Sequence, residues 1–247
     1  METLFKLISI IFEDEDLLVI NKPAGIAVHG DGKTDELTLV DWILKQYPDI
    51  EGVGEDTQTD EGIIVPRPGI VHRIDKETSG ILIITKNQES FEYFKQAFKD
   101  REIKKTYFAF VAGTPRDSRG LISFPIGRST TDVRKWAVGN NARGEMREAF
   151  TKYKVQKSAS GVSLLEVWPQ TGRTHQIRVH LSAIGHPILA DGLYAKNRRN
   201  PLSFKRLALH ASRLIFKHLS GKEVVLEAPF PEDFNQAFKL LSIDLPK

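Results

Sequence analysis

Residues Gly69–Gly80 read GIVHRIDKETSG, and residues 81–86 continue as ILIITK. The apolar residues before His72 and the longer apolar run after Gly80 have the length and composition of β-strands. Between them Asp75 lies in a polar turn that two strands hold in place, a position where scaffolds present reactive groups. An aspartate in a turn often only accepts hydrogen bonds from the nearby backbone, so the turn alone assigns no reaction. This stretch therefore predicts a strand, a turn that presents Asp75, and a second strand.

Short strands and a few helices are predicted on either side of this unit. The best helix covers residues 88–101, where Phe91, Phe94 and Phe98 recur on one face, and a second helix follows Thr174. Strands are expected at residues 17–20, 81–85, 107–111 and 164–167, a hairpin at 207–217 with 223–227, and a closing helix at 232–241. Regular strand–helix alternation is missing. The sequence therefore predicts an α+β fold with a mixed, mostly antiparallel β-sheet flanked by helices.

The composition indicates an ordinary globular protein. The chain has 247 residues, of which 40% are hydrophobic and 27% charged, and we expect residues 1–247 to form a single domain. Residues 52–62 read GVGEDTQTDEG, which predicts an acidic flexible loop. No apolar run reaches the roughly 20 residues of a membrane-spanning helix. The absence of cysteine excludes disulfides and thiolate nucleophiles, and together with the N-terminus, which lacks a cleavage site, it predicts a cytoplasmic protein without membrane contact.

The net charge of +3 conceals a strong asymmetry along the chain. Residues 1–62 contain 15 acidic and 4 basic residues, a net charge of −11, whereas residues 63–247 carry a net charge of +14. Such a distribution is typical of a basic body that meets a polyanion while an acidic flank faces away. Two solvated faces of opposite charge would give the same count, so the charge alone leaves both interpretations open.

Residues 170–180 read QTGRTHQIRVH and are rich in histidine and arginine. His175 and His180 are five residues apart, which is not the spacing of a helical zinc pair, and no HExxH motif accompanies them. Arg178 lies among apolar residues, and a guanidinium withdrawn from water needs an anionic partner. Asp75 and Asp191 are the candidate partners. A metal-dependent hydrolase remains an alternative, built from His175, His180, His186 and Asp191.

Residues 104–113 read KKTYFAFVAG, two lysines followed by an aromatic strand. A tyrosine beside basic residues can stack on a nucleobase while lysines contact phosphate. Tyr107, Lys104 and Lys105 are therefore candidates for such contacts, although a tyrosine on a strand is more often part of the core.

These segments, in this order, resemble the RluA/RluD-type RNA pseudouridine synthases. The resemblance rests on HRIDKETSG, KKTYFAFVAG and TGRTHQIRVHLSAIGHPILAD, on DLLVINKPAGIAVHG at residues 16–30, and on RLALHA at residues 206–211. It spans nearly the whole chain. Many members carry a small N-terminal RNA-binding domain, and we expect this chain to be the catalytic domain alone.

The resemblance implies an active cleft across the sheet and roles for individual residues. Asp75 matches the catalytic aspartate, Tyr107 the tyrosine that packs against the target base, and Arg178 the arginine paired with that aspartate. Arg73 matches the arginine that enters the stack where the target base leaves it. The substrate-binding residues expected with them are His72, Arg173, His175, Lys104, Lys105, Arg198 and Arg199, and further candidate phosphate contacts are Arg128, Arg134, Lys135 and Lys196.

The implied activity is isomerisation of specific uridines to pseudouridine in ribosomal RNA or transfer RNA, with the target base flipped out of its stack. The reaction is redox-neutral, so neither a cofactor nor a metal is expected. We expect a monomer whose partner is RNA. The alternative from another class is a non-catalytic RNA-binding or chaperone protein derived from a synthase.

Overall fold

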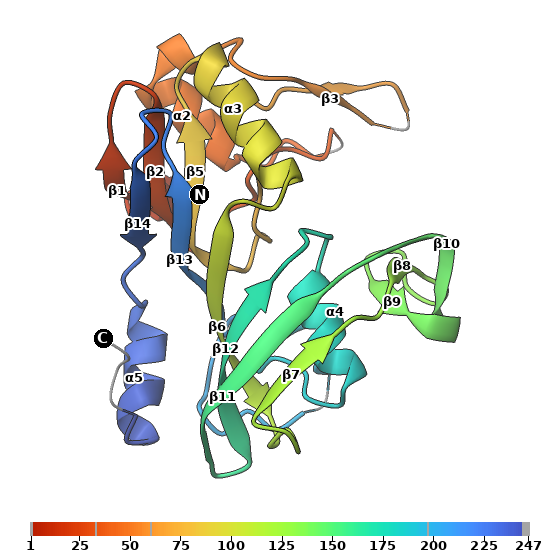
Figure 1. The fold of residues 1–247 in the computed structure, drawn as a ribbon. Coiled ribbons are helices and arrows are strands. Elements are labelled where there is room, and N and C mark those ends of the chain that lie inside the picture. The colour runs from red at the N-terminus through yellow and green to blue at the C-terminus, as the bar shows by residue number, and fades with distance from the viewer. Residues whose placement is uncertain (1, 33, 60, 197, 244–247) are drawn as a thin grey trace. The chain divides into compact units, whose positions relative to one another are not determined.

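The computed structural model describes residues 2–32, 34–59, 61–196 and 198–243 (Figure 1). The chain forms two compact units. Unit 1 comprises residues 1–104 and 213–229, and unit 2 comprises residues 105–212 and 230–247. The chain therefore passes from one unit to the other three times, and each unit consists of two separate segments of the sequence.

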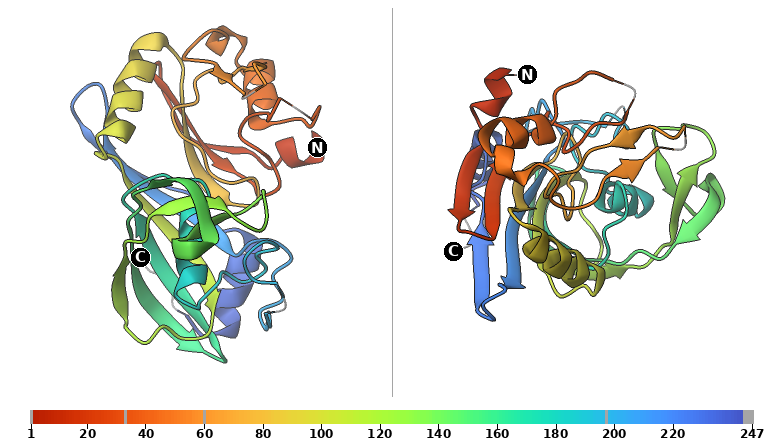
Figure 2. Two further views of the ribbon diagram at one scale, coloured as in Figure 1. Left: turned by 90° about the vertical axis from the view of Figure 1, so that its right-hand side faces the viewer. Right: turned by 90° about the horizontal axis from the view of Figure 1, so that it is seen from above.

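Unit 1 is built from antiparallel strand pairs and three α-helices. Its helices are α1 (Glu2–Phe5), α2 (Leu39–Gln46) and α3 (Gln88–Lys99), with a 3-10 turn at Pro48–Ile50. Its strands are β1 (Ser9–Glu13), β2 (Leu17–Lys22), β3 (Thr57–Gln58), β4 (Ile64–Val65), β5 (Ser79–Thr85), β14 (Glu223–Glu227) and the second part of β13 (Leu209–Lys217). Strand β2 pairs with β1 on one side and with β5 on the other. Figures 1 and 2 show the short β3–β4 hairpin extending away from these strands.

The two central strands of unit 1 are apolar on both faces. Residues 17–20 (LLVI) and 81–84 (ILII) are almost completely buried. A continuous apolar run of this kind forms a strand that is covered on both faces, in contrast to the alternating pattern of a surface strand. These strands form the rigid base from which the turn of Asp75 is presented.

Helix α3 begins where Asn87 caps it and packs on the strands of unit 1 through its aromatic face. The Asn87 side chain accepts a hydrogen bond of 2.8 Å from the Ser90 N–H, which satisfies a free donor of the first turn. Phe91 and Phe94 are buried, and the Phe94 ring meets the Phe216 ring of β13 at 5.4 Å. The expected aromatic face is thus the packed face of this helix.

Unit 2 contains four neighbouring antiparallel strands of the main sheet, a smaller sheet and two α-helices. The four strands pair in the order β6-β12-β11-β7, from β6 (Lys104–Ala112), β12 (Val162–Pro169), β11 (Thr151–Ala159) and β7 (Arg119–Ile122). The small sheet pairs β8 (Ile126–Ser129) with β9 (Trp136–Val138) and β10 (Ala142–Arg147), beside a 3-10 turn at Gly139–Asn141. The helices are α4 (Gln176–Ala183) and α5 (Glu232–Leu240), and the first part of β13 also belongs here. Figure 1 shows the small sheet next to α4.

An aromatic cluster forms the core of unit 2. The Phe110 ring of β6 lies 5.3 Å from the rings of both Phe204 and Phe234, and 5.7 Å from the ring of Phe238. Burial of large rings supplies most of the driving force for such packing. Helix α5 is therefore attached to the sheet by its phenylalanines.

The expected α+β class with a mostly antiparallel sheet is confirmed. The single domain remains a prediction, since the chain divides into two compact units. Within the segment 52–62, Thr57 and Gln58 form strand β3, and Asp60 lies outside the described residues. Across the described residues, no helix combines the length and apolar character needed to cross a membrane.

Candidate active-site residues

Asp75 lies in the irregular segment between an isolated bridge at Ile70 and strand β5. Ile70 pairs with Ile84 of β5, Ile74 is buried, and the Thr78 N–H closes the turn by donating to the Asp75 carbonyl oxygen at 3.0 Å. The Asp75 residue itself is half-buried. The expected turn between two apolar segments is therefore present, and it holds the carboxylate at a fixed place on unit 1.

Gly69 allows this segment to run tightly against β5. Its φ is +68°, and a Cβ atom there would lie 2.4 Å from the Thr85 carbonyl oxygen. The Thr85 N–H donates to the Gly69 carbonyl oxygen at 3.0 Å. Only glycine accepts both the left-handed backbone and this close approach without strain.

A buried lysine fastens the turn of Asp75 to the end of β2. Lys22 has no solvent exposure, and its Nζ donates to the carbonyl oxygens of Pro23 (2.9 Å), Ile26 (2.8 Å) and Lys76 (3.2 Å). The Gly25 N–H donates to the same Lys76 carbonyl oxygen at 2.8 Å. Lys76, the residue after Asp75, thus accepts two hydrogen bonds from the NKPAG turn at residues 21–25. Sequence reasoning missed this role, because the contact joins residues 54 positions apart.

His72 and Arg73 precede Asp75 and make different contacts. The His72 ring stacks on Phe98 of α3 with a centroid distance of 4.3 Å, and its Nε2 accepts a hydrogen bond of 2.9 Å from the Ile83 N–H. The His72 Nε2 is therefore occupied by a hydrogen bond within the protein, and an RNA contact of His72 remains a prediction. Arg73 is exposed, and its Nη1 donates to Nε2 of His29 at 2.8 Å.

His29 is a neutral acceptor for Arg73. Burial is the main cause that lowers the pKa of His29, to about 4, and the nearby charges of Arg73 and Arg67 lower it further. Since Nδ1 lies 2.8 Å from the Gly30 carbonyl oxygen, the proton of the neutral ring is on Nδ1 and the lone pair on Nε2 faces Arg73. The sequence pattern NKPxGxxVH contains this histidine, but its function follows only from the fold.

Tyr107 and the two lysines lie at the start of β6, with Lys105 and Tyr107 in unit 2 and Lys104 as the last residue of the first segment of unit 1. Tyr107 is half-buried, packs against the aromatic core and lies opposite Val167 of β12. Lys104 is exposed, and the Nζ of Lys105 lies 3.9 Å from the position that a Cβ on Gly172 would take. Lys105 therefore reaches the turn formed by residues 170–176, which holds Arg173 and His175.

Arg178 lies on α4 and forms a buried ion pair with Asp191. Its Nε donates to Oδ2 at 2.8 Å and its Nη2 to Oδ1 at 2.9 Å, with side-chain exposures of 7% and 0%. The guanidinium also lies over the Tyr194 ring at 5.2 Å. Asp191 is thus an observed partner of Arg178. The pairing of Arg178 with Asp75 joins the two units and remains a prediction.

Buried hydrogen bonds shape the turn before α4. The Gln176 Oε1 accepts from the Thr171 hydroxyl at 2.6 Å and from the Arg173 N–H at 3.0 Å. His175 has a positive φ of 57°, and its Nδ1 lies 3.0 Å from the Tyr194 hydroxyl. Arg173 is half-buried, with its Nε donating to the Glu148 carbonyl oxygen. Gln176, Thr171 and Tyr194 were not predicted. Tyr194 meets His175 across 19 positions, whereas Thr171 and Gln176 are only five residues apart and their sequence carries no signal of the hydrogen bond between them.

The remaining candidate phosphate contacts lie on the surface of unit 2. Arg198, Arg199 and Lys196 are exposed, and Asn197 between them lies outside the described residues. Arg128 stacks over the Trp136 ring at 4.5 Å, and Arg134 pairs with Asp132 at 2.9 Å. Lys135 lies over the Tyr194 ring at 5.7 Å. No described interaction assigns these residues to RNA, so their contacts remain predictions.

The histidines of the metal alternative each make separate contacts in unit 2. His180 is buried and lies 2.9 Å from both the Thr151 hydroxyl and the Phe124 carbonyl oxygen, and burial lowers its pKa. The His186 Nδ1 donates to the Ala112 carbonyl oxygen at 2.9 Å. With Asp191 on Arg178 and His175 near Tyr194, these four residues do not form one cluster.

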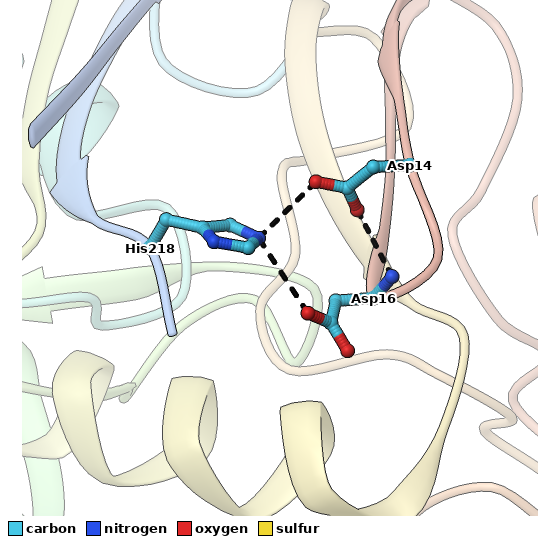
Figure 3. Close-up of side chains that lie close together, drawn as sticks. All are labelled: Asp14, Asp16 and His218. Atoms are coloured by element: carbon cyan, nitrogen blue, oxygen red, sulfur yellow. Dashed lines mark hydrogen bonds and ion pairs between the residues drawn. The ribbon is translucent and has the colours of Figure 1, made fainter. Parts of the chain in front are cut away.

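Within the described parts of the chain, one group of side chains has the composition of a metal site. Asp14, Asp16 and His218 lie in unit 1, and Figure 3 shows the His218 Nε2 turned toward both carboxylates. It lies 3.2 Å from Asp14 Oδ2 and 3.7 Å from Asp16 Oδ2. The Ser220 N–H donates to the His218 Nδ1, which places the proton of the neutral ring on Nε2, the nitrogen that faces the two carboxylates. We therefore describe this group as a histidine–carboxylate contact.

Comparison with known proteins identifies the family to which this chain belongs. A sequence model described as RNA pseudouridylate synthase matches residues 16–183, and the chain therefore belongs to this family of isomerases. A ribosomal large subunit pseudouridine synthase D of Zymomonas mobilis is 39% identical over 244 residues, which cover 96% of this chain and 73% of the relative. An RNA pseudouridine synthase of Aquifex aeolicus is 37% identical over 248 residues, which cover 97% of this chain and 74% of the Aquifex protein.

Solved structures support the same assignment. The human protein RNA Pseudouridylate Synthase Domain Containing 4 superposes with a TM-score of 0.75 at 26% identity, covering 100% of this chain and 97% of the human chain. Human RNA Pseudouridylate Synthase Domain Containing 1 gives a TM-score of 0.71 at 28% identity, with coverages of 91% and 84%. The predicted family and the predicted enzyme class, an RNA pseudouridine synthase, are confirmed.

Proposed function

We propose that this chain isomerises specific uridines in the RNA of the large ribosomal subunit, with Asp75 as the catalytic carboxylate. The ribosomal target is supported by the relative from Zymomonas mobilis, which is named for that subunit. The role of Asp75 is supported by one observation above the others. It is a half-buried carboxylate on a turn that Lys22, Gly25 and Thr78 hold in place.

The chemistry needs an ionised carboxylate and no external fuel. The bond from C1′ of the ribose to N1 of the base breaks, the bond from C1′ to C5 forms, C5 loses a proton and N1 gains one. Product and substrate are isomers, so no electrons are exchanged with a partner. Asp75 either attacks C1′ or removes a proton from the ribose, and both routes begin from the carboxylate. Because hydrogen bonds fix the turn, the Asp75 carboxylate stays in the position from which it can react.

The other residues of the proposal contact the target base or take its place in the RNA stack. The target uridine leaves its stack, Tyr107 packs against it, and Arg73 enters the vacated place. Arg178 orients the carboxylate of Asp75 in this scheme. The enzyme acts as a cytoplasmic monomer, without a cofactor or a metal.

Replacing Asp75 tests the proposal directly. Asp75→Asn keeps the shape of the side chain but loses its nucleophilic and basic capacity, so pseudouridine formation should fall by on the order of a thousandfold or more. RNA binding and melting temperature should stay close to those of the parent. The matched control is Glu77→Gln, which changes an exposed carboxylate of the same turn and should keep parental activity.

Turnover is measured on large-subunit ribosomal RNA and on transfer RNA, and pseudouridines are mapped in cells with and without the gene. Multiple turnover by Asp75→Asn would remove the catalytic assignment. Modification of transfer RNA alone would replace the ribosomal target. RNA binding by the parent without any pseudouridine formation would favour the non-catalytic RNA-binding protein.

A further inference from the structure

Unit 1 contains a cavity of about 420 Å³ next to the turn of Asp75, lined by polar and apolar groups. Its walls come from the segment after the NKPAG turn, from the β3–β4 hairpin and from the segment that leads to Asp75. Side chains on these walls include His29, Thr34, Gln58, Arg67, Arg73 and Lys76. The volume falls within the roughly 300–1,000 Å³ of small-ligand sites, but the lining is unusually rich in hydroxyl and charged groups.

Two of the cationic groups in this cavity have no carboxylate partner among the described residues. Lys76 is neutralised by Glu36 at 2.6 Å, and the Asp31 carboxylate accepts from the Thr34 N–H and hydroxyl. Arg73 instead donates to the neutral ring of His29. In the part of the chain that the structure describes, the Nε of Arg67 is buried and has no hydrogen-bond acceptor.

The two guanidinium groups also lie close enough to act on each other. The pKa of Arg67 is lowered, mainly by burial and further by the charge of Arg73. Like charges in a partly buried space are unfavourable unless an anion joins them, and a buried donor without an acceptor carries a desolvation cost. Carboxylate and phosphate are the anions whose oxygens match the planar fork of arginine, and an RNA substrate supplies phosphate.

We infer that this cavity binds a phosphodiester group of the RNA, with Arg67 as its ligand. The inference rests on the proposed function, because it assigns the anion to the substrate strand. Arg73 is two residues from Asp75, a span of at most about 7 Å of backbone. The phosphate therefore belongs to a nucleotide that adjoins the target uridine, and the hydroxyl-rich walls surround that nucleotide.

A pairwise replacement experiment tests this contact. The parent and Arg67→Gln are each titrated with substrate RNAs that carry one uncharged methylphosphonate linkage at successive positions around the target uridine. In the parent, a methylphosphonate at one particular linkage should weaken RNA binding by on the order of tenfold, the loss typical of a charge-assisted hydrogen bond. In Arg67→Gln the same linkage should have no further effect, because its partner is already absent.

Two further variants control for charge and folding. Arg101→Gln removes an exposed arginine of the same unit and should respond to every linkage as the parent does. Arg67→Lys keeps the positive charge and the long stem but loses the arginine fork. It should keep the parental salt dependence and a reduced linkage-specific effect at the same position, so a poorly folded Arg67→Gln protein would not prevent the test.

The outcomes separate this inference from the proposed function. If the parent forms pseudouridine and Arg67→Gln loses affinity at the same linkage as the parent, the phosphate contact is wrong and the function stands. If the parent modifies no RNA, the proposed function fails first. A site for free phosphate would appear in calorimetry as binding of inorganic phosphate or uridine 5′-monophosphate that Arg67→Gln abolishes, with RNA binding unchanged, and this would overturn the assignment to the strand.

Discussion

At the scale of single residues, Arg178 is a buried cation whose charge is balanced by a buried carboxylate. Its guanidinium is almost buried and binds both oxygens of Asp191, whose Oδ1 also accepts from the N–H groups of Leu193 and Tyr194. Arg178→Met leaves the fully buried Asp191 carboxylate without its cation, which should cost about 3–5 kcal/mol of unfolding free energy. Thermal melting measures this loss.

The catalytic assignment of Arg178 makes an additional prediction. Arg178→Met and Asp191→Asn both break the pair, but only the first removes the guanidinium that the family resemblance assigns to Asp75. At a temperature where both variants are folded, single-turnover pseudouridine formation should be slower in Arg178→Met by on the order of tenfold or more. Equal rates in the two variants would show that Arg178 only stabilises the fold.

His29 gives a prediction for the dependence of stability on pH. Its pKa is about 4 in the folded chain and near 6.5 when unfolded, so above pH 6.5 the ring is neutral in both states. Between pH 6.5 and 4 the unfolded state binds the proton first, and stability falls as the pH falls. Because the ring is only partly buried, we expect a contribution on the order of 1–2 kcal/mol.

The matched variant is His29→Gln, which can accept a hydrogen bond from Arg73 but does not titrate. Urea unfolding at pH 7.5 and at pH 4.5 should show a smaller loss of stability in the variant than in the parent. Parallel losses would contradict the neutral, partly buried ring. His180, whose pKa burial also lowers, is present in both proteins and cancels in the comparison.

At the scale of elements, Lys22 joins the end of strand β2 to the turn of Asp75. Lys22→Met removes the ammonium from three carbonyl oxygens, which should cost about 2–4 kcal/mol and lower the melting temperature by about 5–15 °C. Activity should fall further than stability explains, because the turn loses one of its two bonds at Lys76. The exposed Lys45→Met in α2 is the control, and an unchanged melting temperature in Lys22→Met would contradict this role.

The elements with strong local patterns were predicted well. Helix α3, the hairpin of β13 with β14 and the closing helix α5 lie within one or two residues of the expected bounds, because aromatic spacing and a Ser-Gly turn mark them. Strands β8, β9 and β10 were not predicted. Residues 142–147 read ARGEMR, are mostly exposed and lack alternating apolar residues, so their strand conformation depends on pairing with β8.

The same distinction holds for the candidate site. Asp75 could be named from its motif, because its turn and both flanking segments are continuous in sequence. Lys22, His29 and Arg67 could not, since each acts on groups that are distant in the chain, as Arg73 and His29 are by 44 positions. Contacts of this kind depend on how β2, β5 and the β3–β4 hairpin pack, which no local pattern determines.

At the scale of the whole molecule, the positive charge is concentrated after residue 62, and unit 2 carries the exposed arginine pair Arg198 and Arg199. Replacing both with glutamine should lower the slope of log affinity against log salt by about one for each RNA phosphate that these arginines neutralise. The control replaces Arg116 and Arg119, which are exposed in the same unit and were not assigned to RNA. A slope unchanged by the first pair, or equally reduced by the second, would contradict a localised interaction with phosphate.

The division of unit 1 into two segments has a consequence for synthesis on the ribosome. When residues 1–104 have emerged, Phe94 of α3 still lacks Phe216, and Asp14 and Asp16 still lack His218. These partners follow only after residues 105–212 have been translated. The first 104 residues therefore have an uncovered aromatic surface while residues 105–212 are translated, an interval in which a nascent protein is exposed to aggregation and to chaperones.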